Sequence, residues 1–361
     1  SAKVTGSTSA PNRATTTTRP VDTYTEFAHA GPYAAGTMTM SVHGDLVVVW
    51  YPAPPSSTAG KTKFVYHVRS FLPKAIQSII PKSFPDGVTE DAYAGLPVAS
   101  GEFPVVLFSH GFSGFPDQST FLTAHLATWG FIVAAADQTS MDIGDTVLGK
   151  LNPSLALNIR QQTAALAAIR ALGRASSSIF SGHVNESEAG IVGHSAGGET
   201  AVATAAADPA IKVVVSLAGV PATPPKRSLP MLFMTGSSDH VVPSAGIELF
   251  YEQVRAPKGL LVIDGTGHNV FDDVCTIARS EGGLGGAAKL LHLPVPSSIL
   301  GLAADGCKPP DVYPPIAWPL IDQATIAELR YGFGQDSSPV GLGPGLDHAF
   351  HGVTGIYSSD I

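Results

Sequence analysis

The sequence has little charge, few cysteines and no long hydrophobic run. Charged residues make up 14% of the 361 residues and hydrophobic residues 44%, and this balance excludes a disordered chain, which needs low hydrophobicity and high net charge. The net charge of -8 argues against nucleic-acid binding, because such a protein needs a basic face. No apolar run reaches the ~18–20 residues that cross a bilayer. We therefore expect a soluble, globular protein without a nucleic-acid partner or a transmembrane segment.

The only cysteines are Cys275 and Cys307. Residues 1–20 form a low-complexity tail rich in Thr and Ser, of the kind that often follows a removed secretory signal, so we expect a secreted, extracellular protein. Because an oxidising compartment leaves few thiols unpaired, a disulfide between the two cysteines is favoured. Two buried free thiols are the alternative.

Short apolar runs alternate with helical patterns along most of the chain. The apolar runs that indicate strands are a hairpin at 38–42 and 46–51, where the second strand is expected to end at Pro52, and single strands at 105–108, 131–134, 189–192, 213–215, 231–233 and 260–263. Small or apolar residues recur at helical spacing at 120–128, 157–172, 196–207 and 244–255. This alternation predicts an α/β fold, in which helices cover both faces of a mostly parallel sheet.

Two segments fall outside this alternation. Residues 61–99 contain a predicted helix at 70–80, and residues 282–319 are rich in Gly and Pro and precede a last helix at 320–331. Neither segment can easily supply a core of its own. We therefore expect a single domain at 21–361 with these two segments as insertions.

The sequence Gly193-His194-Ser195-Ala196-Gly197 matches the pattern G-x-S-x-G, which places a serine on a sharp turn between a strand and a helix. An apolar strand precedes the motif and a stretch of small residues follows it, as this turn requires. Ser195 is the predicted nucleophile. A glycine-rich turn with an idle serine is the alternative.

A serine hydroxyl needs a base to remove its proton, and a third group must hold that base in the correct tautomer. His268 lies late in the chain, after the strand at 260–263, and is the predicted base. Asp239 follows the strand at 231–233 and gives the chain order Ser, Asp, His. Asp264 is the rival for the third position, and capping of the next helix is the alternative role for Asp239.

Acyl transfer also needs N–H donors for the oxyanion. We assign them to the backbone of Ala196, after the nucleophile, and of Phe112, in the glycine-rich loop after the strand at 105–108; an ordinary loop is the alternative. The predicted substrate-binding residues are Phe112, Phe115, His194, Val241 and Val242. No cluster of Arg or Lys accompanies them, so a neutral apolar or aromatic ester is expected.

His348 and His351 have a ligand-like spacing in the C-terminal tail. Because no other metal-ligand cluster accompanies them, an exposed polar tail is the favoured interpretation, and no metal site is expected.

Four motifs, FPVVLFSHGFSG, GHSAGG, TGSSDHVVP and DGTGHNVF, resemble in this order the serine α/β-hydrolases. The chain looks closest to the bacterial branch related to platelet-activating-factor acetylhydrolases and dienelactone-hydrolase-like proteins, with cutinases and polyester hydrolases as neighbours. The resemblance covers roughly residues 34–275. It implies a sheet of about eight strands, no metal or other cofactor, and ester hydrolysis through an acyl-enzyme.

The sequence also departs from these relatives. Dienelactone hydrolases use cysteine where this chain has Ser195, and compact polyester hydrolases commonly have methionine where it has Ala196 and lack long insertions. We expect a secreted, monomeric serine esterase that acts on neutral esters, polyesters included. A lipase or phospholipid-ester hydrolase, with 290–302 as an interfacial or lid segment, is the alternative. A catalytically silent binding protein of the same fold is the non-enzyme alternative.

Overall fold

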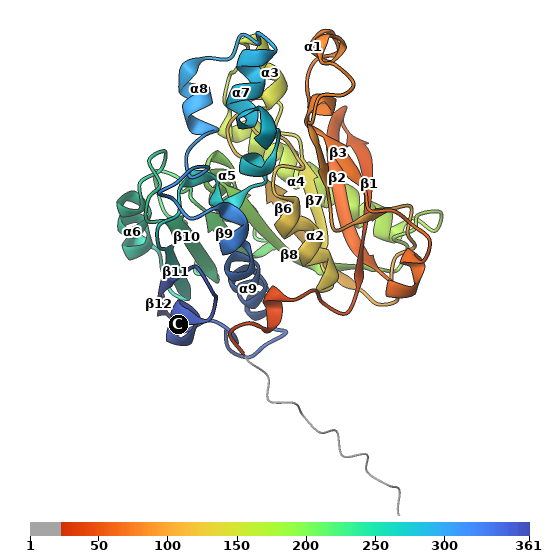
Figure 1. Ribbon diagram of the computed structural model, residues 1–361. Helices are drawn as coiled ribbons and strands as arrows, with labels where there is room; N and C mark the ends of the chain where they lie inside the picture. Colours follow the sequence, from red (N-terminus) through yellow and green to blue (C-terminus); the bar gives the residue numbers. More distant parts are fainter. Residues whose placement is uncertain (1–22) are drawn as a thin grey trace, which may run out of the picture.

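A computed structural model of the protein describes residues 23–361, so the tail expected at 1–20 lies outside the described residues. Its centre is a ten-stranded sheet with the order β12-β11-β10-β9-β8-β6-β7-β2-β1-β5 (Figure 1). The strands are β1 (Ala34–Val42), β2 (Asp45–Ala53), β5 (Tyr93–Ala94), β6 (Phe103–Ser109), β7 (Ile132–Ala136), β8 (Val184–His194), β9 (Ile211–Leu217), β10 (Met231–Gly236), β11 (Lys258–Ile263) and β12 (Gly355–Asp360).

The six central strands run parallel to one another; in sheet order they are β11, β10, β9, β8, β6 and β7. Antiparallel pairings join β1, β2 and β12 to the sheet. The predicted α/β fold with a mostly parallel sheet is thus confirmed, but ten strands replace the expected eight or so. The two additional strands lie at the edges. β5 has only two residues, and β12 is largely exposed, so neither has the continuous apolar run of a buried strand.

The predicted hairpin is present, but its second strand continues through Pro52 to Ala53. β2 pairs with β7 only over residues 47–50, and β1 is the partner at Pro52. Because the β7 ladder has already ended, the missing N–H of Pro52 removes no hydrogen bond to that neighbour.

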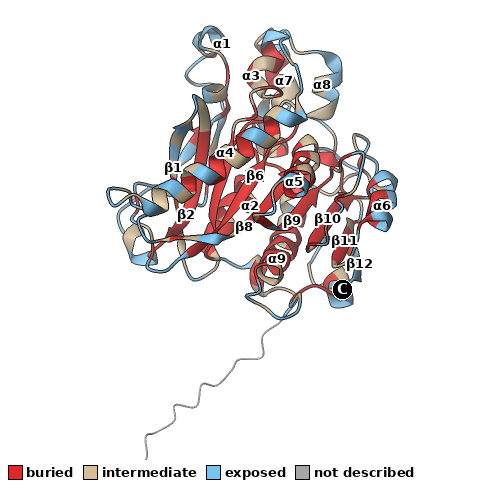
Figure 2. Cartoon of the chain, turned by 180° about the vertical axis from the view of Figure 1, so that it is seen from behind, coloured by how far each residue is buried: buried red, intermediate tan, exposed pale blue. Residues whose placement is uncertain are grey.

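Helices cover both faces of the sheet. One core cluster joins α2 and α9 to side chains such as Val106 and Val192, and a second joins α4, α5 and α6 to the alternate side chains, such as Val105 and Ile191. Figure 2, in which buried residues are red, shows that the strands between these helices are mostly buried. The bounds are α2 (Thr120–Thr128), α4 (Leu155–Arg174), α5 (Ala196–Ala207), α6 (Ser244–Gln253) and α9 (Pro314–Gly332).

Shorter helices gather at the end of the molecule that is uppermost in Figure 1. They are α1 (Lys74–Ile79), α3 (Ile143–Leu148), α7 (Gly283–Leu290) and α8 (Ser297–Leu302). A separate two-stranded ladder, β3 (Val65–His67) with β4 (Gly87–Thr89), belongs to the first insertion. The 3-10 helices are η1 (Glu26–Ala28), η2 (Pro55–Thr58), η3 (Val68–Phe71), η4 (His268–Phe271), η5 (Val274–Thr276), η6 (Arg279–Glu281) and η7 (Pro344–His348).

Two helix predictions need correction, and proline is the reason in both. The helix expected at 70–80 is divided into η3 and α1, because Leu72 precedes Pro73 and takes an extended conformation. The last helix begins at Pro314, six residues earlier than the predicted start, and continues through Pro319. A proline this close to the N-terminal end removes one helical hydrogen bond, which the packing of α9 against the sheet offsets.

Among residues 23–361, no helix is long and apolar enough to span a membrane. The assignment of residues 21–361 to one domain stays a prediction.

Candidate active site

Ser195 lies on the sharp turn between β8 and α5, with a left-handed φ of 57° and a ψ of -123°. The flanking glycines permit this turn. A Cβ on Gly193 would lie 2.1 Å from the carbonyl oxygen of Gly197, and a Cβ on Gly197 would lie 2.0 Å from that of Ser109. Both positions therefore require glycine, and the strained backbone keeps Ser195 at the carboxyl end of the parallel strands.

His268 and Asp239 form a buried pair. Asp239 follows β10, His268 follows β11, and Nδ1 of His268 lies 2.8 Å from Oδ2 of Asp239. The other oxygen of Asp239 accepts hydrogen bonds from the N–H groups of Val241 and Val242, at 2.9 Å and 2.7 Å. Both side chains of the pair are almost completely buried. The carboxylate is thus fixed from two sides, in a geometry that orients the imidazole.

The rival carboxylate, Asp264, does not contact His268. It accepts a hydrogen bond from the exposed Ser237 hydroxyl at 3.1 Å, and its backbone pairs with Thr354. The structure therefore brings His268 together with Asp239.

The second ring nitrogen of His268 has no hydrogen-bond partner among the described residues, although it is buried. His268 and Ser195 line the same pocket. A buried nitrogen without a hydrogen bond costs free energy and is rare in a hydrophobic core. Such a nitrogen in the same pocket as a serine is therefore typical of a reaction site. This nitrogen is the one available to exchange a proton with a group in the pocket.

The loop after β6 passes directly beside the serine. A Cβ on Gly111 would lie 3.3 Å from Cβ of Ser195, and the Gly111 N–H is held by the Gln118 side chain at 3.2 Å. Within the described part of the chain, the N–H groups of Phe112 and Ala196 donate no hydrogen bond to the protein. Two backbone donors are thus left free near Ser195.

His194 lines the same pocket and is held by hydrogen bonds at both ring nitrogens. Its Nε2–H donates to the carbonyl oxygen of His268 at 3.2 Å, and its Nδ1 accepts from the Gln118 amide at 3.0 Å. Burial, together with the neighbouring His268, lowers the pKa of His194 well below its usual range. A neutral imidazole with one donor and one acceptor fits both partners.

The remaining predicted substrate-binding residues divide into two groups. Phe112 and Phe115 line the pocket, and Phe115 stacks on Phe71 of the first insertion with ring centroids 4.9 Å apart. Val241 and Val242 do not line this pocket; they contribute the backbone N–H groups that hold Asp239.

The second insertion supplies a residue that the sequence did not reveal, Asp305. Its carboxylate accepts a hydrogen bond from the backbone N–H of His268 at 2.6 Å, and its carbonyl oxygen accepts one from the Asn269 side chain at 2.8 Å. The predicted disulfide between Cys275 and Cys307 is present and joins the same two segments. The nearby Cys307 was the only sequence signal that this stretch lies against the histidine loop.

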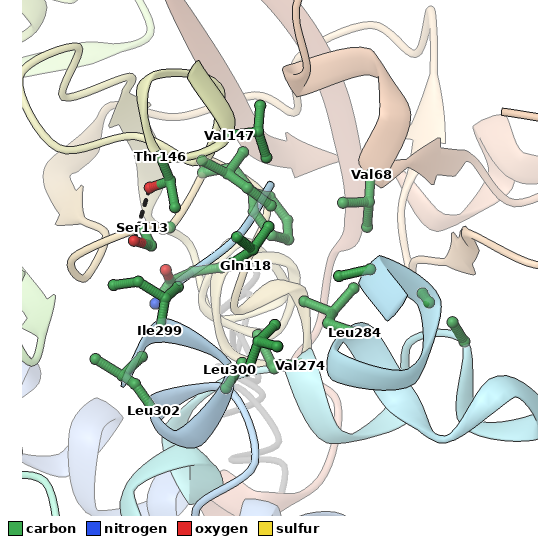
Figure 3. Close-up of a pocket in the computed structure, with 18 of the residues that line it drawn as sticks. Val68, Ser113, Gln118, Thr146, Val147, Val274, Leu284, Ile299, Leu300 and Leu302 are labelled. Carbon is green, nitrogen blue, oxygen red and sulfur yellow. Dashed lines mark hydrogen bonds between the residues drawn. The ribbon is translucent and has the colours of Figure 1, made fainter. Parts of the chain in front are cut away.

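The pocket above Ser195 is large and mostly apolar, with an empty volume of about 1050 Å³ that includes solvent at its mouth. Side chains of the loop after β6, of α3 and of both insertions form its wall (Figure 3). Within residues 23–361, no group of three or more His, Cys, Asp or Glu side chains is arranged to hold a metal ion.

A serine on a strand-turn-helix elbow, with a paired histidine and aspartate after later strands of a mostly parallel sheet, defines an α/β-hydrolase. The family model described as PET hydrolase-like matches residues 93–280, more than half of the chain, and the chain belongs to this family. It is therefore a carboxylic ester hydrolase. No curated protein matches the chain. The resemblance to serine α/β-hydrolases is confirmed.

Proposed function

We propose that the protein is a secreted serine esterase that cleaves neutral carboxylic esters through an acyl-enzyme. The observation that carries the proposal is the buried Asp239–His268 pair, whose free Nε2 lines the same pocket as Ser195. In this assignment Ser195 is the nucleophile, His268 the general base and Asp239 the group that orients it.

The cycle has two halves. In the first, Nε2 of His268 takes the hydroxyl proton as Ser195 attacks the ester carbonyl, and then gives this proton to the departing alcohol. In the second, His268 takes a proton from water, which attacks the acyl-serine, and then returns this proton to the Ser195 oxygen as the acid leaves. Asp239 keeps the proton of His268 on Nδ1 throughout, so that Nε2 is free to act as the base.

The backbone N–H groups of Phe112 and Ala196 are the proposed oxyanion hole. Both are free of other hydrogen bonds within the described chain, and Gly111 brings the first of them close to the elbow. Donors of this kind are fixed before the reaction and act on charge that develops in the transition state, where one such donor is worth ~10²–10³ in rate.

A neutral substrate fits the charges of the site. Among residues 23–361, Arg69 is the only Arg or Lys that lines the pocket, and its guanidinium is already paired with Asp86 at 2.8 Å and 2.6 Å. No cation is therefore free there to pair with a charged acid. Among neutral esters, the family description favours polyesters as substrates. Lipid esters are the second candidate, because the wall of the pocket is mostly apolar.

Secretion is part of the proposal. Its support is the Cys275–Cys307 disulfide, since such bonds persist in oxidising compartments, together with the Thr/Ser-rich tail of the sequence. We propose a monomer.

Labelling with a fluorophosphonate tests the catalytic assignment. We expect the probe to modify Ser195, and Ser195→Ala to lose both labelling and hydrolysis of p-nitrophenyl acetate. Ser83→Ala, on an exposed loop of the first insertion, is the matched control and should behave as the unaltered protein. A folded protein that neither reacts with the probe nor hydrolyses short esters would be a catalytically silent binding protein.

A further inference from the structure

The wall of the pocket above Ser195 offers almost no hydrogen bond to a ligand. The apolar side chains that form it come from α3, from both flanks of α1 and from the second insertion; they include Leu72, Ile80, Val147, Leu284, Val295 and Leu300. Several of them also form a packed cluster of their own, in which Leu72, Ile80 and Val147 are buried against Leu291 and Val295. The apolar wall is therefore held in place by its own packing.

The polar residues in the wall are already satisfied. The hydroxyls of Ser113 and Thr146 bond to each other at 2.7 Å, as the dashed line in Figure 3 shows. The Arg69 guanidinium bonds to Asp86 and, at 3.1 Å each, to the carbonyl oxygens of Pro81 and Phe84. The Ser113–Thr146 bond joins the loop after β6 to α3, and the Arg69 bonds stabilise the first insertion, so these groups are not available to a substrate.

The polar groups closest to the elbow are satisfied as well. Gln118 is shared between His194 and Gly111, and the Asn269 amide donates to the carbonyl oxygens of Leu302 and Asp305 at 2.8 Å each. Apart from Ser195 itself, every polar side chain of the wall thus has a partner within the described residues. Among the described residues, Nε2 of His268 is the one buried side-chain nitrogen or oxygen of the wall left without a partner.

We propose that this pocket binds an uninterrupted hydrocarbon chain of the ester, and that the enzyme is selective for long-chain aliphatic esters over polyesters. The inference rests on the proposed function. Each methylene that enters the pocket leaves water and gains binding. A polyester chain carries an ester group every few atoms, and each one buried here would lose its hydrogen bonds to water without replacement.

The residues that make the pocket apolar lie mostly outside the stretch that matches the family. The match covers 93–280, whereas Val68, Leu72, Ile80 and Phe84 precede it and the wall residues from Leu284 to Ala303 follow it. The family model therefore describes the reaction site and leaves the selectivity to the chain's own insertions.

A matched set of substrates provides the first test. We expect kcat/KM for p-nitrophenyl esters to rise by at least about 30-fold from acetate to octanoate, an average of nearly twofold for each of the six added methylenes, against a limit of about fourfold for a fully buried one. An acyl chain of the same length with two methylenes replaced by ether oxygens should lose about tenfold or more of kcat/KM. A parallel series of alkyl acetates shows whether the chain belongs to the acid or to the alcohol; a rise in one of the two series supports the proposal.

Pocket-filling variants with neighbouring controls provide the second test. Ala288→Phe on α7 and Val147→Phe on α3 place a ring where the wall is lined by a small side chain. Each should lower the ratio of kcat/KM for the octanoate ester to that for the acetate at least tenfold. Leu290→Phe and Leu148→Phe, exposed residues on the same two helices that do not line the pocket, should retain the preference for the long chain. Using two variants keeps the test valid if one of them fails to fold.

The outcomes separate this inference from the proposed function. If short esters are cleaved normally but kcat/KM is flat or falls with chain length in both series, the hydrocarbon pocket is wrong and the esterase stands. Faster hydrolysis of a polyester film than of long-chain esters has the same meaning. Absence of all ester hydrolysis, with no labelling of Ser195, would instead refute the proposed function.

Discussion

The carboxyl end of the sheet and the cap, which we define as residues 61–99 and 282–319, share one cavity but are built differently. The sheet end holds Ser195, Asp239 and His268 through backbone geometry, with a left-handed turn and N–H groups that fix a carboxylate. The cap contributes mainly apolar side chains from short helices. The family match covers the first region and little of the second. We therefore propose that the class of chemistry and the choice of substrate belong to different parts of the chain.

The two regions meet at the histidine loop. Asp305 of the cap accepts a hydrogen bond from the backbone of His268, and the disulfide joins Cys307 of the cap to Cys275. A Cβ on Gly267 would lie 2.5 Å from Cα of Gly306, so the two backbones are in direct contact there. The cap is therefore also a support for the residue that we propose as the base.

The largest effect is expected at the sheet end. Asp239→Asn should lower kcat by about 10⁴-fold, because an amide in place of the carboxylate favours the wrong tautomer of His268. Asp264→Asn is the matched control, since this carboxylate contacts Ser237 and not the histidine, and it should retain activity within about twofold. Equal losses in the two variants, measured with p-nitrophenyl acetate, would refute the assignment of Asp239.

Removal of the disulfide should weaken the connection between the two regions. Cys275→Ser combined with Cys307→Ser is expected to lower the free energy of unfolding by roughly 3–4 kcal/mol in the chain-entropy model. Turnover should also fall at temperatures where the fold survives, because a mobile loop moves the base out of reach of Ser195. Chemical denaturation gives the first value and the esterase assay the second. Titration of two free thiols in the unfolded, unreduced protein would show that no bond had formed.

Asp305→Ala tests the same connection without changing a covalent bond. We expect kcat to fall by about 10- to 100-fold with little change in KM, since the lost hydrogen bond to a carboxylate is worth ~1.5–3 kcal/mol and holds the base rather than the substrate. Asp305→Asn keeps an acceptor oxygen at this position and should recover most of the rate. An unchanged kcat in the alanine variant, or a loss confined to KM, would show that Asp305 does not position His268.

The smallest effect on activity is expected far from the cap, at Glu328 on α9. Burial raises the pKa of this carboxyl from 4.5 to about 8. Between these pH values the unfolded chain releases the proton while the folded chain keeps it, so stability falls as pH rises, by up to about 1.4 kcal/mol for each pH unit. Glu328→Gln cannot ionise and should lose this part of the pH dependence without loss of activity. Denaturation curves at pH 5, 7 and 8.5 make the comparison; parallel behaviour of the two proteins would contradict the raised pKa.

The difference between the sheet and the cap also explains which parts of the structure the sequence could predict. The apolar runs at 105–108 and 189–192 lie within β6 and β8, and α2 and α5 have the bounds that their residue patterns indicate, because these segments follow local periodicity. The motif order also predicted Ser195, Asp239 and His268; the structure pairs Asp239 with His268 and lines one pocket with His268 and Ser195.

The cap could not be predicted in this way. Its helices are short and interrupted by proline, as the division of the expected helix at Pro73 shows. The pocket arises where Leu72 and Val295, more than 200 residues apart, pack into one cluster, and no local pattern records such a contact. Asp305 was missed for the same reason, since its role depends on a backbone N–H in another segment.

The claim that the sheet end supplies the chemistry and the cap supplies the selectivity can be tested in one measurement. A pair of fluorophosphonates with ethyl and octyl chains is reacted with the unaltered protein and with Ala288→Phe, and the rate and site of modification are determined by mass spectrometry. We predict that both probes modify Ser195, that the octyl probe reacts at least tenfold faster, and that only the octyl rate falls in the variant. Modification of another residue, or equal changes in both rates, would contradict the account.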